Sequence, residues 1–199
     1  MNDPVQIPAF PTPLRWLNHP EHWELQDSST LVVRAGAGTD LFTDPGGDAQ
    51  FANAPALVGS VDGDFMLSAR VRLDLTSTYD AAVLLLYTGE DTWAKLCLEL
   101  SPQGKPTIVS VVNRGVSDDC NSFPVESDDV RLRISRLGSA FAFHVRTDGH
   151  FWHLIRYFAL DGAPEVGFCA QSPLGDGRTV RFEDIEYSAK TLTDPRSGV

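Results

Sequence analysis

The chain has 199 residues, of which 16 are Lys or Arg and 27 are Asp or Glu, so its formal net charge is −11. Phosphate backbones and anionic membrane surfaces repel such an acidic chain, which argues against nucleic acids and membranes as partners. Hydrophobic residues make up 42% of the chain, enough for the core of one folded domain and too many for a disordered acidic segment.

The N-terminal residues 1–13 are expected to form an extension outside the domain. They contain no basic segment followed by an apolar run, so no secretory signal is visible, and no stretch of about 18 apolar residues occurs in the chain. The three cysteines, Cys97, Cys120 and Cys169, form no C-x-x-C pair and indicate free thiols. These features predict a cytoplasmic protein.

Alternation of apolar and polar residues with a period of two dominates residues 14–187, the expected domain. It predicts half-buried strands at residues 65–73, 93–100, 130–135 and 141–146, and more continuously apolar strands at 81–87 and 107–112. Asp148-Gly149, ahead of a further strand pattern at 151–157, is the strongest hairpin signal. No segment keeps a helical period over three turns, so the pattern predicts an all-β, two-sheet antiparallel sandwich. Residues 43–55 are expected to be a loop and residues 188–199 a flexible tail.

Several motifs stand in an order that resembles a known family. They are W-L-N-H-P-E-H-W at 16–23, G-T-D-L-F at 38–42, W-A-K-L-C-L-E at 93–99, D-G-H-F-W at 148–152 and G-F-C-A-Q-S-P at 167–173. Together they resemble the uncharacterised YesU-like and "regulation of enolase" proteins of the concanavalin A-like lectin/glucanase superfamily. The resemblance implies a jelly-roll β-sandwich of two antiparallel sheets, one of them concave, and no established reaction.

The sharpest candidate site is a row of side chains on the non-core face of one strand. Residues two apart in a strand share a face, so Trp93, Lys95 and Glu99 are expected to lie in one row. An aromatic ring beside charged side chains suits a sugar. The C–H face of the sugar stacks on the ring, and its hydroxyls form hydrogen bonds with the charged side chains. The alternative is a cross-strand ion pair with the tryptophan packed under a loop.

Basic side chains on other non-core faces extend this interpretation. His144 is expected to contribute to the same groove, with a simple surface histidine as the alternative. Arg131, with Arg133 and Arg146, is suited to recognise a carboxylated ligand such as a uronic acid through its guanidinium. The alternative is that these arginines balance neighbouring acids across strands.

The spacing of acids and histidines bears on two kinds of chemistry, acid–base catalysis and metal binding. Asp80 with Glu99 is the one carboxylate pair that suits acid–base catalysis on a glycosidic bond. His19 and His22, like His150 and His153, are three residues apart, a spacing that suits a helical metal site and not a strand. We therefore expect no metal and no organic cofactor.

These observations predict a protein that binds a carbohydrate or related polar metabolite on its concave sheet, without catalysis. The expected ligand-binding residues are Asp80, Trp93, Lys95, Glu99, Arg131 and His144. One alternative is a glycoside hydrolase or lyase that uses Asp80 and Glu99. Another is a regulatory domain whose sheet face binds a second protein.

Overall fold

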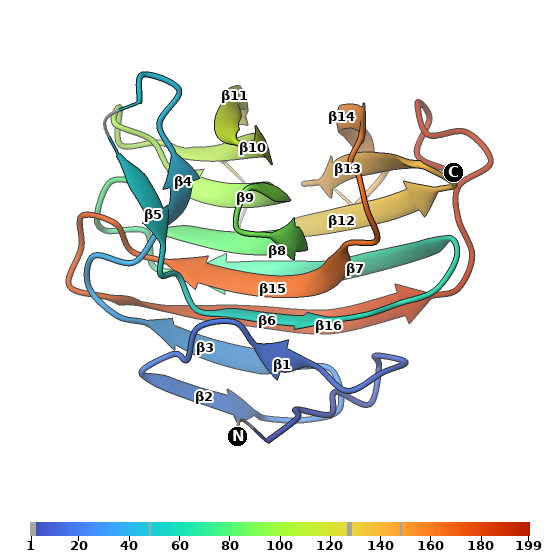
Figure 1. Ribbon diagram of the computed structural model, residues 1–199, viewed down its shortest axis with the longest axis horizontal. Coiled ribbons are helices and arrows are strands. Elements are labelled where there is room, and N and C mark those ends of the chain that lie inside the picture. Colours follow the sequence, from blue (N-terminus) through green and yellow to red (C-terminus); the bar gives the residue numbers. More distant parts are fainter. Residues whose placement is uncertain (1–2, 48, 127–128, 148) are drawn as a thin grey trace.

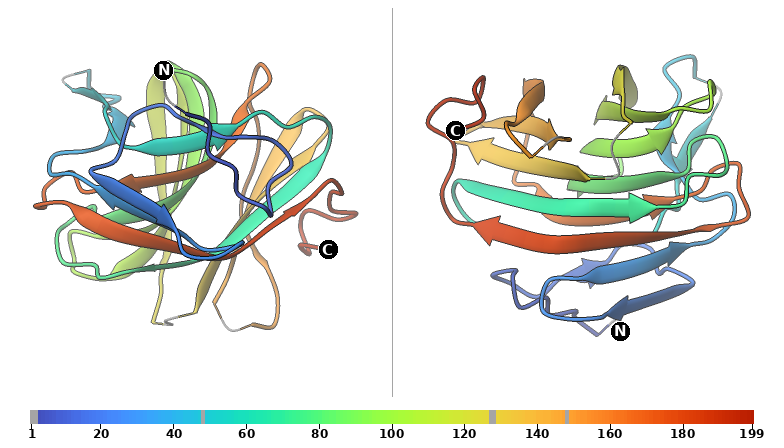
Figure 2. Two further views of the ribbon diagram at one scale, coloured as in Figure 1. Left: turned by 90° about the horizontal axis from the view of Figure 1, so that it is seen from below. Right: turned by 180° about the vertical axis from the view of Figure 1, so that it is seen from behind.

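The computed structural model describes residues 3–47, 49–126, 129–147 and 149–199. Two seven-stranded antiparallel sheets pack face to face, which confirms the expected all-β sandwich (Figures 1 and 2). A separate two-stranded hairpin, β4–β5, stands at one end of the first sheet (Figure 1). Within the described ranges, no helix has the length and hydropathy needed to cross a lipid bilayer.

The strands are arranged with many crossovers between sequence neighbours. The first sheet has the order β1 (Arg15–Trp16), β6 (Ala56–Gly59), β15 (Glu165–Gln171), β8 (Ala81–Gly89), β9 (Thr92–Leu100), β10 (Pro106–Arg114) and β11 (Val116–Pro124). The second sheet has the order β14 (His153–Ala159), β13 (Ala140–Arg146), β12 (Val130–Leu137), β7 (Phe65–Leu73), β16 (Arg178–Ser188), β3 (Leu31–Ala35) and β2 (His22–Leu25). The hairpin consists of β4 (Leu41–Thr43) and β5 (Gln50–Ala52).

The core lies between the two sheets, and strand alternation decides which side chains enter it. On β9, Ala94, Leu96 and Leu98 face the second sheet and are buried with its apolar side chains. Phe168 of β15 and Phe182 of β16 meet across the interior with ring centres 5.0 Å apart. The other face of β9 points away from this core, toward the hairpin β4–β5.

Both ends of the chain pack against the sandwich. In the N-terminal segment, expected to lie outside the domain, Val5, Ile7 and Phe10 are buried in the main core. At the C-terminal end, expected to be flexible, Leu192 is buried and Thr191 donates a hydrogen bond to the carbonyl of Arg136. Hydrophobic side chains without strand periodicity therefore add to the core at both ends, a contribution that a period-two search does not detect.

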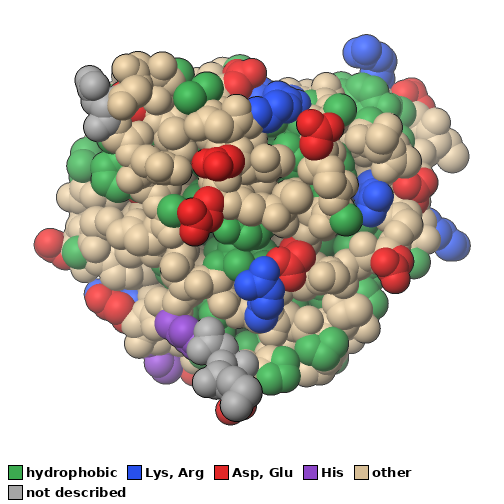
Figure 3. All heavy atoms as spheres, in the orientation of Figure 1, with side chains coloured by type: hydrophobic (Ala, Val, Ile, Leu, Met, Phe, Trp, Pro, Cys, Tyr) green, Lys and Arg blue, Asp and Glu red, His purple; other side chains and the backbone are tan. Residues whose placement is uncertain are grey.

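Two expected turns differ from the observed connections. β5 lies inside residues 43–55, which were expected to be a loop without strands. β13 and β14 pair antiparallel, as the hairpin signal indicates, but β14 begins at His153 rather than at residue 151. Asp148 itself lies outside the described residues. On the face drawn in Figure 3, acidic and basic side chains are interspersed and do not form a patch of one sign.

Candidate functional site

The outer face of the first sheet carries a mixed row of polar and apolar side chains. Because Ala94, Leu96 and Leu98 fill the core, the alternate side chains Trp93, Lys95, Cys97 and Glu99 of β9 point outward. Three of the predicted site residues therefore do share one face. Their environments along this row differ sharply.

Trp93 lies on the expected face but does not offer an open ring. Its side chain is only 1% exposed and packs among apolar groups that include Leu41 of the hairpin. Its indole nitrogen donates a hydrogen bond to the carbonyl oxygen of Glu90 at 3.2 Å. The prediction that Trp93 offers a stacking surface to a sugar is therefore wrong, because the ring is buried in a cluster that includes Leu41 of the hairpin and Ala54 after it.

Lys95 fastens the hairpin to the sheet. Its ammonium is buried and donates hydrogen bonds to the carbonyl of Leu41 at 2.7 Å and to Oε1 of Gln171 at 3.1 Å. It also lies 3.7 Å from Oδ1 of Asp40. A second tie runs from the backbone nitrogen of Thr43 to the hydroxyl of Ser117 on β11 at 2.9 Å. The hairpin is thus held over the sheet, and a pocket forms beneath it.

This pocket, which we call the Glu99 pocket, has a volume of about 220 Å³. Its lining combines acids, an amide, a lysine, aromatic rings and valines: Asp40, Phe42, Tyr79, Lys95, Glu99, Val109, Val111, Asp119 and Gln171. The residues come from β4, β9, β10, β11 and β15 and from the turns before β4 and β8. Segments far apart in sequence therefore meet here.

Glu99 is the unusual group in the pocket. Its side chain lines the cavity, the residue is only 9% exposed, and its carboxylate accepts no hydrogen bond from the part of the chain that the structure describes. Burial raises the pKa of Glu99 to about 7, with Lys95 opposing the shift. A buried carboxyl that opens only onto a cavity is a strong indication of a ligand.

Other polar groups of the pocket are also available. The Oε1 of Gln171 accepts a hydrogen bond from the Lys95 ammonium, which fixes the orientation of the amide. Its Nε2 then has no acceptor among the described residues. Partial desolvation raises the pKa of Asp119, against the attraction of Lys95. The pocket therefore presents an amide donor and carboxyl groups that can accept hydrogen bonds.

Asp80 does not belong to this pocket. It is fully buried, and its carboxylate accepts hydrogen bonds from the hydroxyl of Ser172 at 2.6 Å, from Nε of Arg178 at 2.8 Å and from the backbone of Ser77 at 2.9 Å. The register pairs Ala81 with Glu99, so Asp80 and Glu99 occupy opposite faces of the sheet. The expected pairing of Asp80 with Glu99 is wrong, because Asp80 ties the start of β8 to the start of β16.

Arg131 and His144 lie on the second sheet, away from the other predicted residues. Arg131 pairs with Asp184 at 2.6 Å, as the cross-strand alternative predicts. His144 is buried, and its Nε2 donates a hydrogen bond to the carbonyl of Pro195 at 2.8 Å. Burial lowers the pKa of His144 to about 4, so the ring is neutral at pH 7. The expected single groove shared with Glu99 is therefore wrong.

Sequence reasoning missed seven lining residues, of which two are valines and five are polar or aromatic: Val109, Val111, Asp40, Phe42, Tyr79, Asp119 and Gln171. Asp40, Phe42 and Gln171 belong to motifs that carry the family resemblance, so these motifs could have identified them as site residues. Tyr79 has a backbone φ of 70°, a conformation uncommon outside glycine that no sequence pattern predicts. Asp119 sits on an edge strand that is mostly exposed and shows no apolar alternation.

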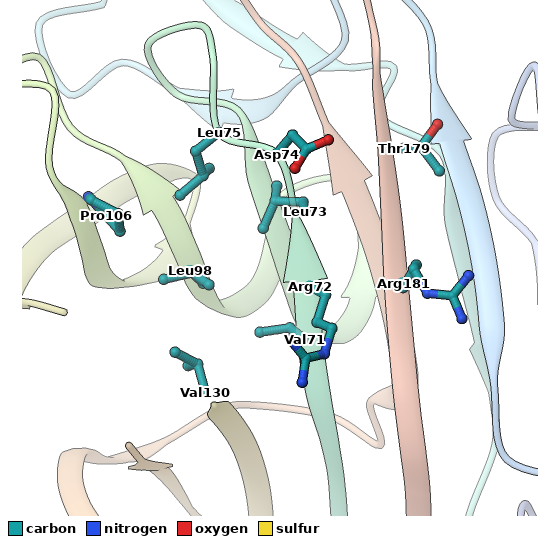
Figure 4. A pocket seen from close by; sticks show the side chains of 10 residues that line it. All are labelled: Val71, Arg72, Leu73, Asp74, Leu75, Leu98, Pro106, Val130, Thr179 and Arg181. Carbon is teal, nitrogen blue, oxygen red and sulfur yellow. The ribbon is translucent and has the colours of Figure 1, made fainter. Parts of the chain in front are cut away.

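A larger pocket of about 430 Å³ is lined by residues of both sheets (Figure 4). Its lining includes Val71, Leu73 and Leu98, and Arg181 points away from these apolar side chains (Figure 4). Arg72 and Arg181 share the single carboxylate of Glu183, each at 3.0 Å, so this acid offsets only part of their combined charge. The acid in its lining, Asp74, is exposed, so this pocket has no buried carboxyl comparable to Glu99.

Metal ligation is not apparent in the parts of the chain that are described. No group of three or more His, Cys, Asp or Glu side chains among them is arranged to hold a metal ion. Cys97 and Cys169 are buried free thiols, and Cys120 is an exposed one. Burial raises the pKa of Cys169 to about 12, so this thiol is protonated and unreactive.

Comparisons with solved structures show the fold. A protein of unknown function from Saccharomyces cerevisiae is 22% identical, with a TM-score of 0.82 over 90% of this chain and 97% of that one. The GH43 BlXynB protein from Bacillus licheniformis is 16% identical, with a TM-score of 0.69 over 89% of this chain and 37% of that one. The CBM2 module of the evolved Dit protein from Lactobacillus casei BL23 phage J-1 is 13% identical, with a TM-score of 0.54 over 88% of this chain and 82% of that one. This chain thus spans little more than a third of the GH43 protein.

No curated protein matches the chain significantly. A family profile, in contrast, matches residues 16–190, which include nearly every strand of both sheets and most of the residues around the Glu99 pocket. The chain therefore belongs to the family described as "Protein of unknown function (DUF1349)".

Proposed function

We propose that the Glu99 pocket binds a small carbohydrate or a related polyhydroxylated metabolite, without catalysis. The observation that carries the proposal is the buried carboxylate of Glu99, which faces the cavity and accepts no hydrogen bond from the described residues. A ligand hydroxyl would donate to this carboxylate and remove the cost of leaving a buried charge unpaired.

The other walls of the pocket suit the same ligand. Phe42 and Tyr79 provide aromatic surface for the C–H face of a sugar ring. Gln171 and Asp119 offer a donor and an acceptor for further hydroxyls. These side chains take over the role that the sequence pattern assigned to Trp93.

The size of the pocket limits the ligand. Its volume of about 220 Å³ lies below the roughly 300–1,000 Å³ of pockets for drug-sized molecules. A single sugar ring fits such a cavity better than an oligosaccharide. Binding is favoured over hydrolysis because Asp80, the proposed partner of Glu99 in acid–base catalysis, is buried on the opposite face of the sheet.

The family resemblance supports this proposal at the level of architecture. The motifs at residues 16–23 and 93–99 resemble YesU-like and "regulation of enolase" proteins, and we infer that the chain is related to them within the concanavalin A-like superfamily. The GH43 protein and the CBM2 module share only the sandwich fold with this chain, so their activities are not carried over to it.

The proposal is tested by calorimetric titration with D-galactose, D-glucose, D-xylose and L-arabinose. We expect the wild-type protein to bind at least one of them. Glu99→Ala should weaken this affinity at least about tenfold, because a charge-assisted hydrogen bond contributes about 1.5–3 kcal/mol. Tyr79→Ala should weaken it as well, because the ring loses its contact with the sugar.

Glu24→Ala is the matched control, because Glu24 is an exposed carboxylate on β2 of the other sheet. It should bind the same sugar as tightly as the wild-type protein. Absence of binding for all four sugars, or equal loss of affinity in Glu99→Ala and Glu24→Ala, would refute the proposal. Hydrolysis of a p-nitrophenyl glycoside that is abolished in Glu99→Gln would instead establish catalysis.

A further inference from the structure

The outer face of the second sheet holds two arginines that the Glu99 pocket does not use. The guanidinium carbons of Arg133 on β12 and Arg146 on β13 lie 4.1 and 4.9 Å from the ring centre of Trp152. Neither guanidinium forms an ion pair with a carboxylate of the described residues. Two unpaired cations around one indole are exceptional in a chain whose net charge is −11.

Neighbouring arginines on the same face show the contrast. Arg70 pairs with Asp129 at 3.0 Å, and Arg131 pairs with Asp184 at 2.6 Å. Acids are therefore within reach of this face, and they compensate the arginines on one side of it. No carboxylate of the described residues pairs directly with Arg133 or Arg146, so their positive charge is only partly offset at one place on this face.

That place is a pocket of about 390 Å³, which we call the Arg146 pocket. Its lining contains the two arginines, the indole, two serines, one acid, a methionine and a tyrosine: Arg133, Arg146, Trp152, Ser68, Ser188, Glu186, Met66 and Tyr187. With two guanidiniums and one carboxylate, the lining has a net charge of about +1 at pH 7.

The polar groups under this pocket are incompletely satisfied. Arg133 donates from Nη2 to the carbonyl of Gly198 at 2.9 Å, but its buried Nε has no acceptor among the described residues. Burial, reinforced by the charge of Arg146, lowers the pKa of Arg133 to about 10. A bound anion would offset the desolvation and the repulsion between the two cations.

The C-terminal segment packs closely against two of the residues that line this pocket, Trp152 and Arg133. Gly198 has a φ of 79°, and a side-chain carbon at this position would lie 2.7 Å from Cβ of Trp152 and 3.2 Å from Nη2 of Arg133. Only glycine fits this approach without displacing the indole or the guanidinium. The segment therefore holds both groups in place at the pocket.

We propose that the Arg146 pocket binds a small organic molecule with a single carboxylate, which the guanidiniums of Arg133 and Arg146 hold. The planar donor fork of arginine matches a carboxylate in geometry and charge. Glu186 disfavours a dianion such as phosphate, because it leaves the pocket with a net charge of only about +1. Ser68 and Ser188 supply hydroxyls for the polar groups that accompany the carboxylate.

Calorimetry at low ionic strength with three probes tests this site. D-galacturonate and D-galactose differ at C6, where one carries a carboxylate and the other a hydroxymethyl group, and inorganic phosphate tests for a general anion site. We expect D-galacturonate to bind more tightly than the other two probes. Arg146→Gln should weaken its binding about tenfold, equivalent to about 1.4 kcal/mol, and Arg146→Lys should restore only part of the affinity, because the fork is lost.

Arg72→Gln is the matched control, because Arg72 lies on the same sheet but is already paired with Glu183. Its affinity for D-galacturonate should stay within about twofold of the wild-type value. Equal binding of galacturonate and galactose by the Glu99→Ala variant, or equal losses in Arg146→Gln and Arg72→Gln, would overturn the proposal. Glu99→Ala should leave galacturonate affinity unchanged, so the two pockets succeed or fail independently. Circular dichroism and thermal melting establish that each variant is folded.

Discussion

At the residue scale, three buried charged groups of the first sheet have three different roles. Asp80 accepts hydrogen bonds from a hydroxyl, a guanidinium and the backbone, so its charge is fully compensated within the fold. Lys95 donates to the hairpin and to Gln171 and thereby positions the walls of the Glu99 pocket. Glu99 alone opens onto the cavity without a hydrogen-bond donor among the described residues. Burial by itself therefore does not identify a functional side chain. A buried charged group that lacks hydrogen-bond partners within the fold is the better indication.

The raised pKa of Glu99 predicts a pH-dependent stability. Its pKa rises from an ordinary value of 4.5 to about 7 on folding, so the folded state keeps a proton that the unfolded state loses between these values. Stability must then fall as the pH rises from about 4.5 to 7, by up to about 3 kcal/mol. Glu99→Gln should remove this loss, so the variant should be more stable than the wild-type protein at pH 8 and should approach it below pH 4.5.

Urea unfolding across this pH range measures the effect. Glu24→Gln, which changes an exposed carboxylate, should keep the wild-type pH profile. A profile for Glu99→Gln that runs parallel to the wild-type profile would show that the carboxyl is not the group that titrates.

At the element scale, the outward face of the first sheet is shaped by close contact between strands. β15 lies between β6 and β8, and Gly167 of β15 pairs with Val58 and Leu85 on either side. A Cβ at Gly167 would lie 2.0 Å from the carbonyl oxygen of Leu57, well below any contact that real side chains make. Since that atom belongs to the backbone, no rotamer change relieves the overlap, and β6 would have to move.

Gly167→Ala should therefore destabilise the protein by at least about 3 kcal/mol, at the upper end of the cost of overpacking. Gly89→Ala on β8 is the control, because no heavy atom lies within 4 Å of its added carbon and its φ is not positive. It should change the free energy of unfolding by less than about 0.5 kcal/mol. Comparable stability of the two variants in urea unfolding would contradict the proposed strand contact.

Strand elements were predictable because each long strand carries its own period-two pattern. That pattern places Trp93, Lys95 and Glu99 on one face without reference to any other segment. It does not report what covers the face, so the burial of Trp93 under the hairpin was not predictable. It also does not report which sheet a strand joins, and for this reason His144 was grouped with residues of the opposite sheet.

At the scale of the whole molecule, the sandwich separates two pockets of different charge. The Glu99 pocket on the first sheet contains three acids and one lysine, whereas the Arg146 pocket on the second contains two arginines and one acid. The net charge of −11 describes neither environment. The long-range pairing of strands decides where charge accumulates, and a property averaged over the sequence cannot show it.

The N-terminal segment completes the core of the whole molecule, which leads to a prediction for truncation. Val5, Ile7 and Phe10 are buried in the main core, and Val5 also pairs with Leu14 through backbone hydrogen bonds of 2.8 Å in both directions. Each such side chain contributes about 1.5–3 kcal/mol on burial, so removal of residues 1–10 should cost at least about 4 kcal/mol, a large part of the roughly 5–15 kcal/mol of a typical domain. Removal of residues 1–4 is the control, because it leaves all three side chains in place, and it should lower the melting temperature by no more than a few degrees. Equal melting temperatures for the two truncations would mean that the sandwich closes its core without this segment.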